Sequence, residues 1–247
     1  MTKPLLLIRA CLFAACTLGG GQDTQSHEIG HQWINHLSQP TLAPAVAHWP
    51  LSTMANGTMG FTIPGTGAGG EYSCRLVPVA GGIQLEPFSG PRAFNDIDLY
   101  LMGLKPANQV PTQYVWKDQA AALAAYNASP CSGTVPYSSF TAITVNDIVA
   151  SDGVRTPTAA NAQKDFKLAV IVVSDAALSF DAMSFYTFFA QCAEARTPID
   201  IHQGFTVGKG WPFYVATGGL GTLTSAVSAT ATRTTAQIEA YIASLLL

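Results

Sequence analysis

Residues 26–37, SHEIGHQWINHL, contain three of the five histidines of this chain. The apolar residues of the stretch recur at near-helical spacing: Ile29, Trp33, Ile34 and Leu37. Because Asp23 and Thr24 stand where a helix N-cap is expected, the sequence predicts a helix over residues 24–38. A glycine at position 30 makes this helix about 1 kcal/mol less stable than an alanine would. The close approach of another part of the chain, which leaves no room for a side chain, would explain why glycine is present.

The spacing of the first two histidines predicts a metal site. On a helix, His27 and His31 are separated by about 40° in azimuth and about 6 Å along the axis, so their imidazoles can converge on one ion. Neutral imidazoles suit Zn²⁺. Glu28 projects beside the ion, where it can take a proton from an activated water and pass it to a leaving amine. The H-E-x-x-H motif therefore predicts zinc as the cofactor, His27 and His31 as ligands, and Glu28 as the general base.

The third protein ligand of this site comes from one of three residues. His36 is nearest in sequence, but five residues past His31 on a continuous helix it is turned about 140° away. His48, in AHWP, is preferred because the Pro-rich loop after the helix can bring it back over the site. Asp98, in NDIDLY, offers a carboxylate from a second short helix, although an acid at a helix N-terminus also satisfies the helix dipole. We interpret His202 as an ordinary surface residue.

The rest of the chain alternates short β-prone and helical segments. Residues 55–93 are rich in glycine and predict a small β-meander, and DFKLAVIVVS (165–174) predicts a strand buried on both faces. Further strands are predicted at QYVWK and FTAIT, and further helices at NDIDLYLMGL, DQAAALAAY, VNDIVASD, residues 179–195 and residues 233–246. Residues 222–235 predict a loose connector before the last helix. The pattern indicates an α+β fold in one domain.

Composition limits the classes of partner. The 247 residues are 48% hydrophobic and only 11% charged, the net charge is −3, and no Lys/Arg run occurs. These values argue against nucleic acid and against anionic membrane surfaces as partners. The longest apolar run outside the amino-terminal stretch, residues 168–173, is too short for a transmembrane span. The low charge and the many small residues favour a secreted or cell-envelope protein.

The amino-terminal stretch MTKPLLLIRACLFAACTLGGGQ is typical of an export signal, with a lysine, an apolar stretch and then small residues. FAAC, ending at Cys16, is similar to a lipoprotein processing site. The sequence therefore predicts a leader over residues 1–22 and a single domain over 23–247. Beyond the leader, Cys74, Cys131 and Cys192 allow one disulfide and one thiol, with the pairing open.

Five segments resemble an uncharacterised group of secreted bacterial zincin-type metallopeptidases: HEIGHQW, HWP, TMG, DIDLYLMGLKPANQVP and DFKLAVIVVS. The resemblance implies a zincin-like mixed α/β catalytic domain built around an active-site helix. It matches His27, His31 and His48 to the zinc ligands and Glu28 to the general base.

The same resemblance is metzincin-like in one further respect, because Met102 in LYLMG matches a Met-turn. The longer metzincin motif H-E-x-x-H-x-x-G-x-x-H is not met, since Ile34 replaces its glycine and Leu37 its third histidine. We interpret Tyr100 as a core aromatic, with stabilisation of an oxyanion as the alternative. Zincin domains carry strands before the active-site helix, so residues 4–17 either supply such a strand or the amino-terminal strands are absent from this chain.

These observations predict a monomeric zinc-dependent endopeptidase that acts on a peptide or protein substrate by means of metal-activated water. Two alternatives stay open. The first is a truncated or non-catalytic zinc-binding pseudo-peptidase domain. The second is a secreted binding module in which the histidines are incidental.

Overall fold

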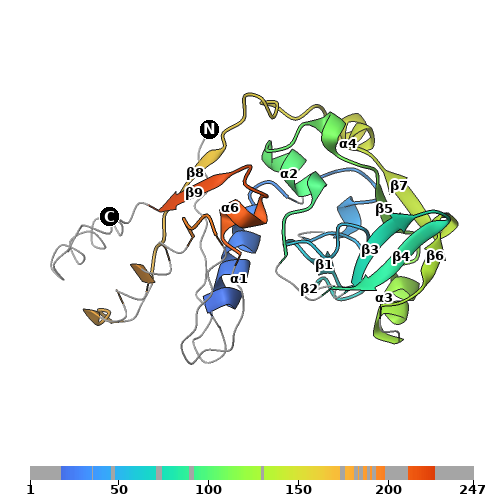
Figure 1. Ribbon diagram of the computed structural model, residues 1–247, viewed down its shortest axis with the longest axis horizontal. Helices are drawn as coiled ribbons and strands as arrows, with labels where there is room; N and C mark the ends of the chain where they lie inside the picture. The colour runs from blue at the N-terminus through green and yellow to red at the C-terminus, as the bar shows by residue number, and fades with distance from the viewer. Residues whose placement is uncertain are drawn as a thin grey trace.

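The computed structural model describes residues 18–34, 36–45, 48–70, 74–88, 92–128, 131–172, 176–180, 183, 186, 187, 190, 193–197 and 211–225. These residues form both α-helices and β-strands, in agreement with the predicted α+β class. Figure 1 shows the β-rich part of the molecule on the right, α1 with α6, β8 and β9 on the left, and α2 between them.

The described helices are short apart from the first. They are α1 (Leu18–Gly30), α2 (Asp96–Met102), α3 (Gln119–Ala128), α4 (Val145–Asp152) and α6 (Phe213–Ala216), with 3₁₀ turns η1 (Ala43–Ala45), η2 (Ala107–Gln109) and η3 (Tyr137–Ser139).

The strands of the described residues form four small sheets. They are β1 (Phe61–Thr62) with β2 (Gly69–Gly70); β3 (Cys74–Val79), β4 (Gly82–Pro87) and β6 (Thr134–Pro136); β5 (Gln113–Trp116) with β7 (Phe140–Ile143); and β8 (Asp165–Leu168) with β9 (Thr222–Ser225). The last pair is parallel and the other pairs are antiparallel. The segment predicted as a meander, residues 55–93, therefore forms strands β1 to β4, but as two hairpins in separate sheets instead of one meander.

Helix α1 differs from its predicted bounds, since residues 24–38 were expected and the helix spans Leu18–Gly30. After Gly30 the chain closes in tighter turns, with Gln32 N–H donating to Ile29 O at 3.2 Å and Trp33 N–H to Gly30 O at 3.0 Å. Gly30 is a poor helix former and ends the regular ladder. Residues 18–22, predicted as part of the leader, form the first turns of α1, and residues 1–17 lie outside the described residues.

An aromatic chain holds the end of α1 against the body of the protein. Trp33 packs edge-to-face on Phe166 of β8, with ring centroids 5.2 Å apart, and Phe166 contacts Phe213 of α6 at 5.6 Å. Phe94 then contacts Phe213 at 5.9 Å. Such edge-to-face pairs add to the stabilisation from burial, and they fix the turn that follows the first histidines.

Helix α2 is fixed at both ends. Asn95 and Asp98 form a capping box at its N-terminus, and Gly103 follows its last residue in the left-handed conformation, with φ of 78°. The guanidinium of Arg155 donates to Leu101 O at 2.8 Å and to Met102 O at 3.0 Å. These bonds satisfy carbonyl groups that a helix end leaves open, so α2 is a rigid support.

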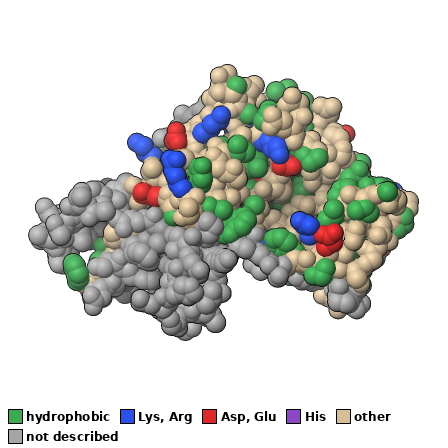
Figure 2. All heavy atoms as spheres, viewed as in Figure 1, with side chains coloured by type: hydrophobic (Ala, Val, Ile, Leu, Met, Phe, Trp, Pro, Cys, Tyr) green, Lys and Arg blue, Asp and Glu red, His purple; other side chains and the backbone are tan. Residues whose placement is uncertain are grey.

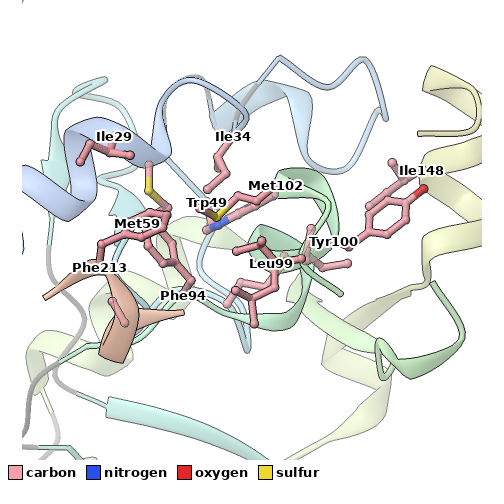
Figure 3. Close-up of a cluster of buried hydrophobic side chains, with 14 of the residues drawn as sticks. Ile29, Ile34, Trp49, Met59, Phe94, Leu99, Tyr100, Met102, Ile148 and Phe213 are labelled. Atoms are coloured by element: carbon pink, nitrogen blue, oxygen red, sulfur yellow. The ribbon is translucent and has the colours of Figure 1, made fainter. Parts of the chain in front are cut away.

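Two hydrophobic clusters share the β5–β7 ribbon as a common wall. The first cluster contains Val115 and Ile143 together with side chains from α1, α2, α4 and α6, shown in Figure 3. The second contains Trp116 and Phe140, which stack at 5.3 Å, together with side chains from β3 and β4. Because successive residues of a strand point to opposite faces, one short ribbon serves both clusters.

The strand predicted at residues 165–174 is shorter and more exposed than expected. Strand β8 covers Asp165–Leu168, and its residues alternate between exposed and buried positions. Among the described residues β8 pairs with β9 alone, so one face contacts the first cluster and the other faces solvent. The prediction of burial on both faces is therefore wrong.

The predicted connector at residues 222–235 is also wrong in its first part, because Thr222–Ser225 form β9. Its remainder and the last predicted helix, 233–246, lie outside the described residues. Phe180, Met183, Tyr186, Thr187 and Ala190 are helical and lie within the helix predicted over residues 179–195, whereas Ala193, Glu194 and Ala195 are not helical.

A disulfide joins Cys74 of β3 to Cys131, which follows α3. Both cysteines are buried in the second cluster. The sequence left open which two of the three cysteines pair, and the structure shows that Cys74 and Cys131 do. Cys192 lies outside the described residues.

Charges of both signs are mixed on the described surface. Figure 2 shows Lys and Arg side chains beside Asp and Glu side chains on the face that it presents. Arg75 pairs with Glu86 at 2.8 Å across the β3–β4 hairpin, and Lys105 pairs with Asp96. Among the described helices, none is long and apolar enough to span a membrane.

Candidate metal centre

Three histidines from two segments converge at the carboxyl end of α1. His27 and His31 come from α1 and the turn after it, and His48 comes from the loop that follows η1. The ring nitrogens offered by the three lie within 4.8 Å of one another. His27 Nε2 is 3.0 Å from His31 Nε2 and 3.3 Å from His48 Nε2. These are the three residues that the sequence predicts as ligands.

The contact of His27 Nδ1 shows which nitrogen of the ring carries the hydrogen. His27 Nδ1 is 2.8 Å from the carbonyl oxygen of Thr58. A carbonyl can only accept, so Nδ1 carries the hydrogen and donates it, and the lone pair of the neutral ring lies on Nε2. Histidine ligands of metals are commonly oriented by such a bond from the other ring nitrogen.

His27 Nε2 lies close to the Nε2 atoms of both other histidines. Lone pairs of neutral imidazoles repel one another at these distances unless a hydrogen or a cation lies between them. Two arrangements satisfy these contacts: neutral His31 and His48 rings that each donate an Nε2–H to His27 Nε2, or one cation bound to all three nitrogens.

The spacing fits a small tetrahedral ion. Two nitrogen ligands of tetrahedral zinc lie about 3.3 Å apart, given bonds of about 2.0–2.1 Å. The observed separations of 3.0 and 3.3 Å are close to that value. The ring of His31 lies at 86° to that of His27 and at 80° to that of His48, whereas the rings of His27 and His48 lie at 30° to each other. The arrangement can hold a metal ion, and its geometry alone does not distinguish zinc from similar ions.

The electrostatics of the cluster favour neutral ligands. Burial, together with the neighbouring His27 and His36, lowers the pKa of His31 to about 4. Burial likewise lowers the pKa of His48 to about 4, with His27 and His31 acting in the same direction and Glu28 opposing them. His31 and His48 are therefore uncharged near neutral pH and have lone pairs to offer. The carboxylate of Glu28 is therefore close enough to His48 to act on its charge.

Two glycines give the site its shape. A Cβ on Gly30 would lie 2.4 Å from Met59 Sδ and 2.9 Å from Phe94 Cε1, so Met59 packs directly against α1. This contact is the close approach that the glycine in HEIGH predicts, and Figure 3 shows Met59 between Ile29 of α1 and Phe94. A Cβ on Gly69 of β2 would lie 2.7 Å from His48 Nε2. The absence of a side chain at Gly69 thus leaves room for the His48 ring.

The two alternative ligands lie in other places. Asp98 is fully buried, its Oδ1 accepts from Trp49 Nε1 at 2.8 Å, and its Oδ2 accepts from Asn95 N–H at 2.9 Å. His36 is exposed, and its Nε2 donates to His31 O at 3.3 Å. The helix ends earlier than predicted, and this bond ties His36 to the turn after α1, outside the group of converging nitrogens.

Met102 and Tyr100 belong to the core instead of the site. Met102 is the last residue of α2 and is helical, so the predicted Met-turn at this position is wrong. The methionine that contacts the metal-site helix is Met59, in a turn next to Thr58. Tyr100 is buried and points toward Ile148 in Figure 3, in agreement with its interpretation as a core aromatic.

Sequence reasoning missed three residues around the site. Thr58 orients His27 through its carbonyl, Met59 packs against α1, and Gly69 leaves room for the His48 ring. The motif TMG and the run GTGAGG were the available signals, but neither carries a chemical group that points to a metal. His202 lies outside the described residues.

Comparisons with models of protein families, with curated proteins and with solved structures find no match to this chain.

Proposed function

We propose that this protein is a secreted zinc-dependent endopeptidase with a zincin-like catalytic domain, in which α1 is the active-site helix. The observation that carries the proposal is the convergence of three imidazole nitrogens beside a glutamate, within 4.8 Å of one another. Three nitrogen donors that leave a fourth position for water are typical of catalytic zinc, whereas structural zinc is usually enclosed by four protein ligands.

Each residue of the site has a separate task in peptide hydrolysis. His27, His31 and His48 would hold the ion, and the Thr58 carbonyl keeps the Nε2 lone pair of His27 directed at it. A bound zinc ion would supply Lewis acidity, which acidifies water and polarises the scissile carbonyl. Glu28 would accept the proton of the attacking water and then donate it to the nitrogen of the leaving amine.

The half-buried setting of the cluster supports this reaction. The three histidines are neither enclosed nor fully exposed, so a substrate can approach while part of the bulk water is excluded. A lower local dielectric strengthens the interactions of Glu28 with the reacting groups.

The test combines metal content with hydrolysis of labelled casein. Wild-type protein purified with zinc and dialysed is expected to keep one equivalent of metal, and Glu28→Gln is expected to keep it too. General-base catalysis typically contributes 10²–10⁴-fold, so hydrolysis by Glu28→Gln should fall by about that factor.

A matched control is Glu86→Gln, which neutralises a partly exposed glutamate of the β3–β4 hairpin and should leave hydrolysis unchanged. A dialysed wild type without zinc would refute the proposal at its first step. A Glu28→Gln variant that holds zinc and cleaves casein at the wild-type rate would refute the assigned role of Glu28. A metal-loaded wild type that cleaves no peptide would establish the non-catalytic alternative.

A further inference from the structure

A buried carboxylate lies one hydrogen bond away from the residue that follows His48. The Asp98 side chain is fully buried, and its Oδ1 accepts the indole N–H of Trp49 at 2.8 Å. Trp49 is itself only 1% exposed. Burying a carboxylate is costly unless it is well hydrogen-bonded, so this position requires a specific explanation.

The capping role of Asp98 explains only half of its environment. Its Oδ2 accepts from Asn95 N–H at 2.9 Å as part of the capping box of α2. Capping boxes work equally well at solvent-exposed helix ends, as Thr144 and Asp147 of α4 demonstrate in this chain. The second oxygen of Asp98 is instead directed into the core, toward Trp49.

The backbone around His48 is tied down on both sides. His48 N–H donates to Ala45 O at 3.0 Å, and the Trp49 carbonyl accepts from Thr62 N–H at 2.8 Å. These bonds hold the main chain to η1 and β1. The indole of Trp49 adds a link to α2, which is rigid because both of its ends are capped.

We propose that Asp98 is a positioning residue for the metal centre, which holds Trp49 by its indole N–H and thereby sets the place of His48. The inference rests on the metal-binding part of the proposed function. Bond lengths in metal sites tolerate only about ±0.2 Å, and His48 is the one member of the cluster that comes from a loop instead of from α1 and its end. The carboxyl group of Asp98 offers one oxygen to the indole N–H and the other to Asn95 N–H, which explains why an acid with two acceptor oxygens occupies this buried position.

The experiment measures Co²⁺ affinity and the visible absorption of bound Co²⁺ in a double-mutant cycle. The variants are Trp49→Phe, Asp98→Leu and the double substitution, all in the full chain. Loss of an outer partner of a metal ligand typically costs 10–100-fold in affinity, so each single variant is expected to bind Co²⁺ about tenfold more weakly, with an altered absorption spectrum. Because both variants break the same bond, the double variant should bind within about twofold of the weaker single variant.

Controls separate positioning from general stability. Thr217→Val removes hydroxyl bonds to Tyr214 O and Gly221 O at a fully buried position after α6, so it should lower the melting temperature while Co²⁺ affinity stays unchanged. Asp98→Asn keeps an oxygen acceptor for the indole and should recover most of the affinity lost in Asp98→Leu. Since Asp98→Leu also removes the capping box, Trp49→Phe, which leaves that box intact, decides the result.

Three outcomes are decisive. Wild-type affinity in Trp49→Phe, or losses that multiply in the double variant, would overturn the positioning role while the proposed function stands. Wild-type protein that binds neither Co²⁺ nor Zn²⁺ would overturn the proposed function itself. Equal, non-additive losses with wild-type affinity in Thr217→Val would establish the positioning role.

Discussion

Substitution of Gly69 by alanine places a methyl group against the imidazole of His48. The Cβ of this alanine would lie 2.6 Å from His48 Cε1 and 2.7 Å from His48 Nε2, whereas ordinary contacts begin at 3.4 Å. The ring must therefore move outward by about 0.8 Å, roughly four times the tolerance of a metal–ligand bond. We expect Gly69→Ala to weaken zinc binding by at least the 10–100-fold that loss of an outer partner costs.

The same substitution should leave the fold almost unchanged. Gly69 lies in the extended strand β2, where alanine is tolerated, and the side chain that it displaces is half-buried. The unfolding free energy of the metal-free protein should therefore stay within about 1 kcal/mol of wild type. Zinc affinity is measured by competition with a chromophoric chelator, and stability by urea denaturation in excess chelator.

Gly67→Ala is the matched control in the same loop. Gly67 has φ of 70°, and a Cβ there would meet nothing within 4 Å. Alanine in this left-handed conformation costs about 1–2 kcal/mol, so this variant should lose stability and keep its zinc affinity. If Gly69→Ala binds zinc as tightly as wild type, the His48 ring does not occupy the position that metal binding requires, and the reasoning is refuted.

Three further predictions concern the ligands, the buried acid and the disulfide. His48→Ala should lose bound zinc and His36→Ala should keep it, as measured by atomic absorption after dialysis; zinc retained by His48→Ala would exclude it as a ligand. Burial raises the pKa of Asp98 to about 7 despite its hydrogen bonds, so the folded protein binds this proton more tightly than the unfolded chain. The contribution of Asp98 to stability therefore falls as pH rises from about 4 to about 7, by up to about 4 kcal/mol. Because the lowered pKa values of His31 and His48 act in the opposite direction over this range, the Asp98 contribution is read as the difference in slope between wild type and Asp98→Asn in urea titrations of the metal-free protein, and equal slopes would contradict the assignment. Reduction of Cys74–Cys131, which are separated by 57 residues, should lower the unfolding free energy by about 2–4 kcal/mol, and an unchanged urea midpoint would show that the bond contributes no stability.

The sequence predicted the local part of the site because that part follows from helical geometry. His27 and His31 converge through their spacing alone, and His36 is turned away as expected, although the helix ends at Gly30 instead of continuing to residue 38. The capped helix at residues 96–102 was also predictable, because Asn95 and Gly103 are strong local signals.

Features that depend on distant segments were not predictable. The carbonyl of Thr58 has no side-chain signature, and the fit of Gly69 to the His48 ring exists only after two loops have packed together. Strand β8 was misjudged because a continuous apolar run does not reveal how many strands will cover it, and among the described residues it has one partner. Asp98 was considered as a ligand from its residue type alone, whereas its oxygens are taken by Trp49 and Asn95.

The β5–β7 ribbon, with a core on each face, divides the protein into two compartments that share one wall. Trp116 and Phe140 face the disulfide-bonded compartment, while Val115 and Ile143 face the compartment that supports the metal centre. Substitutions that preserve the alternation of either strand change the side chains that face one compartment and leave those that face the other in place. An insertion or deletion of one residue in this ribbon is different, because it exchanges the contents of the two compartments at once. The register of these four-residue strands is therefore the feature on which both halves of the protein jointly depend.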